Sequence, residues 1–93
     1  MNEAFERAAE ARNAIASVVD RVRSGELSLQ EAFIEADEQP LIGRCFAVKV
    51  FEAVPDIGKV RARRTMEEVG LDEGIWLRDV PEPARAAVME AFA

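Results

Sequence analysis

The sequence contains no histidine, and its single cysteine is Cys45. Without histidine, we expect neither metal sites built from His and Cys nor acid–base chemistry that uses imidazole. One cysteine excludes a disulfide within the chain, which fits a reducing cytoplasm. Its thiol is expected to be partly buried and inert, with a redox switch as the alternative. No nucleophile–base pair is visible either, so we expect no cofactor and no enzymatic activity.

Long apolar runs are also missing. No segment approaches the roughly 20 apolar residues that a membrane-spanning helix needs. Residues 1–7 have neither the basic start nor the apolar centre of a signal peptide. The 93 residues are 49% hydrophobic, which predicts one small domain with its own core.

Positive charge is scarce but concentrated. The formal net charge is −6, which by itself argues against a nucleic-acid partner. Residues 44–65, however, hold six basic residues and only two acidic ones, whereas the rest of the chain holds six basic and sixteen acidic ones. A partner feels the nearby patch more than the distant total, because salt screens charges beyond roughly 8–10 Å. The local polarity therefore favours an anionic partner at residues 44–65.

Apolar residues recur at helical spacing along the whole chain, and no strand period is present. The pattern predicts an all-α protein with about five helices, over residues 2–23, 28–37, 41–54, 58–69 and 81–92. The first helix carries one apolar stripe, formed by Ala8, Ala11, Ile15, Val18 and Val22. We expect a helix over residues 1–25 and a globular domain over residues 26–93, together forming a single structural unit.

Local signals mark the ends of these helices. Ser28 and Glu31 have the spacing of a capping box, and Gly25 and Gly70 are suited to follow a helix end. Pro40 and Pro55 are expected to end the helices before them. The third helix, Leu41–Val54, would present Ile42, Phe46, Val50 and Val54 on its apolar side.

The joint between the third and fourth helices has the chemistry of a phosphate clamp. Gly58 lacks a Cβ, so the backbone can approach a phosphate closely. The first amides of the helix that it opens have no partner within that helix, and the positive end of the helix favours an anion. Charged side chains lie beside that site: Lys59, Arg61, Arg63 and Arg64. The alternative is an ordinary tight turn with a solvated basic face, in which the last two arginines form exposed pairs with Glu67 and Glu68.

Trp76, the only tryptophan, has two interpretations. It could cover the core by packing on Val88 or Phe92. Alternatively it is exposed, either as a wedge for a DNA minor groove or as an anchor for a protein partner.

Several motifs resemble the actinobacterial integration host factor family of mycobacteria and streptomycetes. They are Ser24-Gly25, Leu29, Ile42-Gly43-Arg44, residues 52–62 (EAVPDIGKVRA), Met66-Glu67 and Gly70-Leu71. The resemblance covers almost the whole chain. It implies a long N-terminal helix followed by a helix–two-turns–helix domain of the helix–hairpin–helix type. It also implies a nucleoid-associated protein of the cytoplasm that binds duplex DNA with little sequence preference and supports compaction and site-specific recombination.

The resemblance assigns roles to individual residues. Gly58, Lys59, Val60 and Arg61 match the family's phosphate-binding hairpin. Arg44 matches the basic residue after Ile-Gly, and Arg78 matches the last arginine of a second basic loop. We add Arg63 and Arg64 to the expected DNA-binding residues because of their charge.

The chain also departs from the family pattern. Asp56 replaces the first glycine of the hairpin and adds a negative charge beside the expected phosphate. The second loop, residues 75–79, keeps one of three arginines and gains Asp79. We therefore expect DNA binding that is weaker than in typical members. The alternative is a protein-interaction module of the same fold, using the Trp76 loop or the acidic surface to bind a recombinase, a repressor or a host DNA-binding protein.

Overall fold

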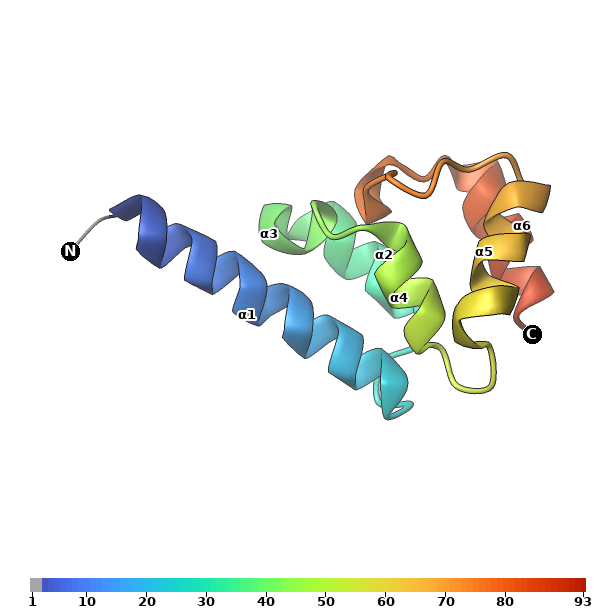
Figure 1. The fold of residues 1–93 in the computed structure, drawn as a ribbon, viewed down its shortest axis with the longest axis horizontal. Helices are drawn as coiled ribbons and strands as arrows, with labels where there is room; N and C mark the ends of the chain where they lie inside the picture. The colour runs from blue at the N-terminus through green and yellow to red at the C-terminus, as the bar shows by residue number, and fades with distance from the viewer. Residues whose placement is uncertain (1–2) are drawn as a thin grey trace.

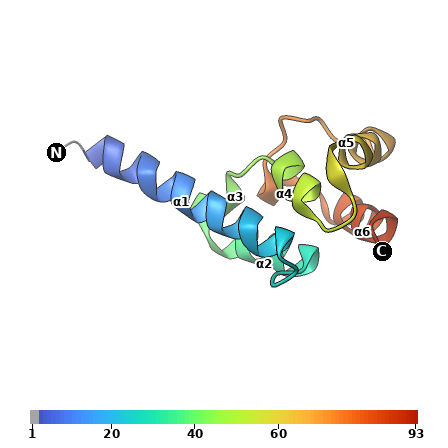
Figure 2. The ribbon, with the colours of Figure 1, turned by 60° about the horizontal axis from the view of Figure 1, so that its bottom comes forward.

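One long helix runs along one side of a cluster of short helices in the computed structural model, and its N-terminal half projects beyond them (Figures 1 and 2). The structure describes residues 3–93, and the side chains of residues 9, 10 and 12–93. The elements in chain order are α1 (Glu3–Arg23), α2 (Leu29–Glu38), α3 (Pro40–Gly43), α4 (Ala47–Ala53), α5 (Gly58–Glu68), the 3₁₀ helix η1 (Leu77–Asp79) and α6 (Glu82–Ala91). No strand occurs within residues 3–93, so the predicted all-α class is confirmed.

The predicted helix boundaries hold where local chemistry sets them. The Ser28 hydroxyl accepts the Glu31 amide, and the Glu31 carboxylate accepts the Ser28 amide, both at 3.1 Å. This capping box satisfies two amides that α2 itself leaves without partners. Gly25 and Gly70 follow the ends of α1 and α5, as predicted. No helix in the described chain is long and apolar enough to span a membrane.

The core lies between α1, α2, α4, α5 and α6. Phe51 is at its centre, with its ring edge-on to Phe33 at 6.1 Å and to Phe92 at 5.8 Å between centroids. Val18 and Val22 bring the C-terminal half of α1 into this core, which confirms that part of the predicted stripe. Ala8 and Ala11, which were predicted to continue the stripe, lie outside the described side chains.

The single helix predicted over Leu41–Val54 is wrong. The chain forms α3 and α4, and residues 44–46 between them are not helical. The carbonyl of Cys45 instead accepts the Leu77 amide at 2.7 Å, and the Ala47 amide donates to Ile75 at 3.0 Å. This pairing breaks the helix, so residues 3–93 form six α-helices and η1 rather than about five helices. The pairing also turns Phe46 out of the predicted apolar stripe. The Phe46 side chain is 50% exposed.

Trp76 does not cover the core, so that interpretation is wrong as well. It lies opposite Phe46 in an antiparallel bridge and is 36% exposed. Its neighbour Leu77 is fully buried instead, and Phe92 packs on Phe51. The backbone bonds of the bridge fix which of the two neighbouring residues faces the core.

Arg85 is a cation used inside the fold. Its guanidinium binds both carboxylate oxygens of Asp37 at 2.7 and 2.8 Å and donates to the carbonyls of Val80 and Arg78 at 2.8 and 3.0 Å. These bonds tie α6 to the end of α2 and to the η1 segment. The Arg85 side chain holds the pKa of Asp37 below its usual range, because a charge-assisted hydrogen bond favours the carboxylate.

Candidate nucleic-acid interface

The turn between α4 and α5 is built by two residues with left-handed backbone. Asp56 has φ of 69° and Gly58 has φ of 72°, with buried Ile57 between them. Aspartate tolerates this region better than most residues, so the turn forms without a glycine at position 56. A Cβ built on Gly58 would meet no atom within 4 Å. Glycine is therefore required there by the backbone angle and not by packing within the chain.

The N-terminus of α5 is open. No side chain caps it, and Ile57 occupies the cap position. The amides of Gly58, Lys59 and Val60 donate to no backbone carbonyl in the described chain. Three unpaired donors at the positive end of an 11-residue helix form a site suited to an anion. Asp56 is exposed next to this site, and its carboxylate opposes an incoming phosphate.

A groove of about 650 Å³ lies beside this helix end, between α1 and α4. Lys59 lines it together with Arg44 and Lys49, so the structure brings the two predicted residues Lys59 and Arg44 to one surface. We call this surface the α1–α4 groove. Its full lining is Arg12, Ile15, Ala16, Val19, Asp20, Arg23, Arg44, Cys45, Phe46, Lys49, Glu52 and Lys59.

The residues that α1 and α4 contribute to this groove were not predicted from the sequence. Arg12, Ala16, Val19 and Arg23 recur at helical spacing, so one face of α1 pairs an apolar floor with basic ends. That spacing was the signal that could have identified them. Lys49 was counted in the basic segment but was not assigned to the site.

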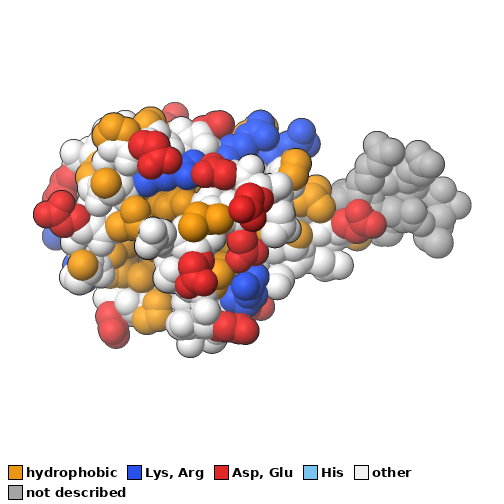
Figure 3. All heavy atoms as spheres, turned by 180° about the vertical axis from the view of Figure 1, so that it is seen from behind, with side chains coloured by type: hydrophobic (Ala, Val, Ile, Leu, Met, Phe, Trp, Pro, Cys, Tyr) orange, Lys and Arg blue, Asp and Glu red, His pale blue; other side chains and the backbone are white. Residues whose placement is uncertain are grey.

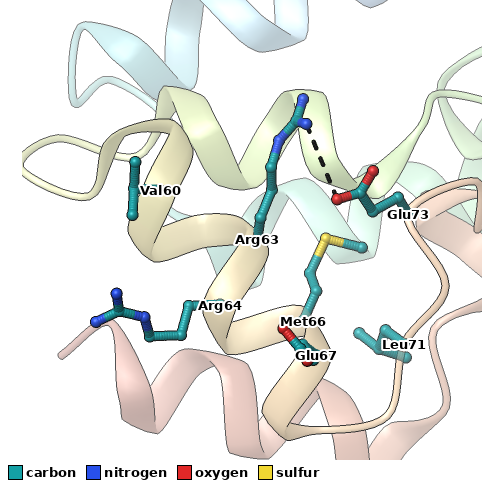
Figure 4. Close-up of a pocket in the computed structure, with 7 residues that line it drawn as sticks. All are labelled: Val60, Arg63, Arg64, Met66, Glu67, Leu71 and Glu73. Atoms are coloured by element: carbon teal, nitrogen blue, oxygen red, sulfur yellow. Dashed lines mark ion pairs between the residues drawn. The ribbon is translucent and has the colours of Figure 1, made fainter.

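The outer side of α5 forms a second hollow, of about 530 Å³ (Figure 4). Val60, which is 72% exposed, lines it with Arg63 and Arg64. Arg63 binds Glu52 at 3.1 Å and approaches Glu73 at 3.9 Å, so its charge is already balanced within the chain. The pairs considered from the sequence, with Glu67 and Glu68, are not the ones that Arg63 forms.

Arg61 faces a third direction. Its guanidinium donates to the carbonyl of Ala91 at 2.6 Å, near the C-terminal end of α6. A cation is favourable at that end of a helix, because the last carbonyls have no partner within it. Arg61 therefore joins α5 to α6 and does not line the α1–α4 groove.

Arg78 lies close to the segment that carries Arg44. Its guanidinium lies over the Trp76 ring at 5.3 Å from the centroid, and its Nε is 3.8 Å from Asp79. A Cβ on Gly43 would come within 2.9 Å of the Arg78 side chain and 2.6 Å of the Ala36 carbonyl. The glycine in Ile42-Gly43-Arg44 therefore makes room for both α2 and Arg78.

Comparison with known proteins identifies the relatives of this fold. The S13-like H2TH domain model matches residues 22–92. The chain is 33% identical over 89 residues to the integration host factor of Mycolicibacterium smegmatis, covering 96% of this chain and 85% of that protein. The chain belongs to the integration host factor family. The integration host factors of Mycobacterium tuberculosis and Streptomyces coelicolor are also 33% identical over 89 residues, with 85% and 83% of their lengths covered.

A solved structure of the integration host factor family has the same fold. It is described as sIHF bound to an 8-base-pair palindromic DNA, and it is 32% identical to this chain. The TM-score is 0.88, with 95% of this chain and 99% of that chain covered. The predicted family and the predicted helix–two-turns–helix fold are therefore confirmed.

The surface of this integration host factor family member is uneven in charge. Figure 3 shows Lys and Arg side chains gathered at one edge of a face, near the place where α1 projects, and Asp and Glu spread over the rest. The Cys45 thiol in the groove wall is buried, and this burial raises its pKa to about 11. At neutral pH it is therefore protonated and a poor nucleophile. Among the described side chains, those of residues 9, 10 and 12–93, no cluster of three or more His, Cys, Asp or Glu is arranged to hold a metal ion.

Proposed function

We propose that this protein binds duplex DNA as an architectural protein, through phosphate contacts and with little sequence preference. The observation that carries the proposal is the open N-terminus of α5, where the amides of Gly58, Lys59 and Val60 are unpaired beside the Lys59 side chain. Arg44 and Lys49 continue this positive surface along the α1–α4 groove. The related structure described as bound to DNA supports the same partner.

The chemistry of the site favours the backbone of DNA over its bases. Helix amides and lysine side chains are phosphate ligands that position a protein on the duplex and carry no base information. The sequence-independent binding that follows suits a protein that compacts DNA or assists recombination on the nucleoid, in the cytoplasm. Arg44, Gly58, Lys59 and Val60 are the proposed contacts at the α5 end, and Lys49 joins them. Arg64 and Arg78 are further candidates, while Arg61 and Arg63 have partners within the chain.

The salt dependence of binding tests this proposal. A labelled duplex of about 25 base pairs would be titrated with the protein at about 50 and 200 mM salt. With four phosphates neutralised, the slope of log K against log salt should be roughly −3.6, which is a loss of about two orders of magnitude across that range. Binding that does not respond to salt would contradict a phosphate-based interface.

Paired variants make the same experiment specific. Lys59→Gln should reduce the slope by about 0.9, which is the value of one phosphate contact. Arg21→Gln removes the same charge from a residue that binds Glu35 and does not line the groove, so it should leave the slope unchanged. Equal changes in the two variants would mean that total charge, and not the α5 site, controls binding.

A further inference from the structure

Two exposed aromatic side chains lie away from the open N-terminus of α5, at the bridge between residues 45–47 and 75–77. The Cys45 carbonyl and the Ala47 amide make the two backbone hydrogen bonds of this bridge, so Phe46 and Trp76 are directly opposite each other but not bonded to each other. At such a position in an antiparallel pair, the two side chains point to the same face and their Cβ atoms are about 4.5–5.5 Å apart. Phe46 and Trp76 therefore form one surface, which we call the aromatic corner.

The rings of the aromatic corner are available to a ligand. Phe46 is 50% exposed and Trp76 is 36% exposed. The aromatic pairs in the described chain are Phe33 with Phe51 and Phe51 with Phe92, so the two corner rings do not cover each other. The backbone bonds of 2.7 and 3.0 Å hold the backbone of both residues in place, so little backbone entropy is lost when a ligand binds.

Cations surround the aromatic corner. Arg78 lies over the Trp76 ring, while Arg44 and Lys49 line the same groove wall as Phe46. The acidic groups nearby are Asp79, which approaches Arg78, and two groove carboxylates, Glu52 and Asp20, which Arg63 and Arg23 already bind. Rigid aromatic faces flanked by arginine and lysine are the combination that stacks unpaired bases and neutralises the phosphates between them.

We infer that the aromatic corner binds single-stranded DNA, by stacking unpaired bases on Phe46 and Trp76 beside Arg78. A half-buried Trp76 that shares its face with Phe46 presents a platform, whereas insertion between the base pairs of a duplex needs a protruding wedge. The positive rim opposes a basic protein segment and suits the phosphates of a strand. The site adds a second form of nucleic acid to the duplex contact proposed above. Its stacking residues, Phe46 and Trp76, lie outside the α5 amides, while Arg44 and Lys49 border both sites.

Fluorescence tests the inference, because Trp76 is the only tryptophan. A thymidine oligonucleotide of about 12 residues should quench Trp76 emission on binding, since a stacked base lies against the indole. An abasic strand of the same length carries the same phosphates without bases, and it should bind more weakly and leave the emission unchanged. Equal binding and equal quenching by the two strands would overturn base stacking. Absence of any quenching by the thymidine strand at about 50 mM salt would overturn it too and would leave the corner to a protein partner.

Variants distinguish strand binding at the aromatic corner from duplex binding at the N-terminus of α5. Trp76→Ala should weaken binding of the labelled thymidine strand about 5- to 150-fold by anisotropy, the range expected for loss of one base stack. Trp76→Phe should restore most of this loss, and both variants should weaken duplex binding much less than strand binding. Lys59→Gln should have the opposite pattern, reducing duplex binding more than strand binding. Thermal unfolding of each variant would show that the fold is kept. If Trp76→Ala binds the strand like the wild type, the inference is wrong, whatever the outcome for the duplex.

Discussion

The cations around α5 fall into two groups that have the same charge but different partners. Arg44, Lys49 and Lys59 line the α1–α4 groove, and none of them pairs with a carboxylate in the described part of the chain. Arg61, Arg63 and Arg85 are bound by acceptors of the protein itself. The basic residues of one segment are therefore not equally available to a partner, because some of them stabilise the fold. Of these six residues, only the first three have no partner in the described part of the chain that competes with a phosphate.

The largest expected effect is on the free energy of unfolding, and it comes from replacing the buried Arg85. Arg85→Ala should destabilise the fold by about 3 kcal/mol, because it breaks an ion pair whose cation is buried and leaves two carbonyls without their donor. Urea unfolding at pH 7 would measure the change. An exposed matched variant, Arg23→Ala, loses only a surface pair with Asp20 and should cost less than about 1 kcal/mol. Similar losses in the two variants would contradict the internal role.

The same variant should change the response to acid. Because Asp37 has a lowered pKa in the fold, its ion pair stabilises the protein above the pKa of the unfolded carboxyl, about 4. That stability is lost as the pH falls through the lower, folded pKa. Arg85→Ala should therefore unfold with less dependence on pH below about 4 than the wild type.

The two groups can be compared directly on DNA. The double variant Lys49→Gln, Lys59→Gln should bind duplex about 60-fold more weakly at 0.1 M salt, since each lost phosphate contact costs about eightfold there. The double variant Arg61→Gln, Arg63→Gln removes the same charge from residues with internal partners. It should weaken binding less than about fivefold, mainly because Glu52 in the groove loses its partner. Equal losses would remove the distinction between the groups.

The smallest effect concerns the acid at the turn. Asp56→Asn removes the carboxylate beside the α5 amides, and asparagine also tolerates the φ of 69°. Duplex binding should strengthen about three- to fivefold, which is the value of one unit charge at short range in water. Glu68→Gln, an equal charge change at the other end of α5, should have little effect. Weaker binding by Asp56→Asn would show that this carboxylate supports the interface.

The parts of the fold that could be predicted from the sequence are those set by residues close together in the chain. The Ser28–Glu31 cap and the glycines after α1 and α5 are local, and they were predicted correctly. The break between α3 and α4 was not, because it depends on pairing with Ile75 and Leu77, about thirty residues away in the chain. The same pairing determines that Leu77 is buried and Trp76 exposed, which periodicity alone could not decide for a loop.

The residues of the candidate site also differ in how far they could be predicted from the sequence. Motif resemblance placed Gly58, Lys59 and Arg44, and the structure puts the last two in one groove. Motif resemblance also selected Arg61, and charge selected Arg63, but the partners that bind them come from α6, α4 and the loop after α5. The contribution of α1 was missed because its helix was examined for one apolar stripe and not for the mixed face beside it.

The central claim is that the first amides of α5 bind a DNA phosphate. The most direct test is to follow backbone amide chemical shifts by NMR while a duplex of about 12 base pairs is added. The account predicts that the amides of Gly58, Lys59 and Val60 shift most among the backbone signals, as expected when free donors meet an anion. It also predicts small changes at the Ala91 end of α6, where Arg61 stays bound. Large shifts confined to α6 or to the outer side of α5, with the three amides unchanged, would contradict the claim.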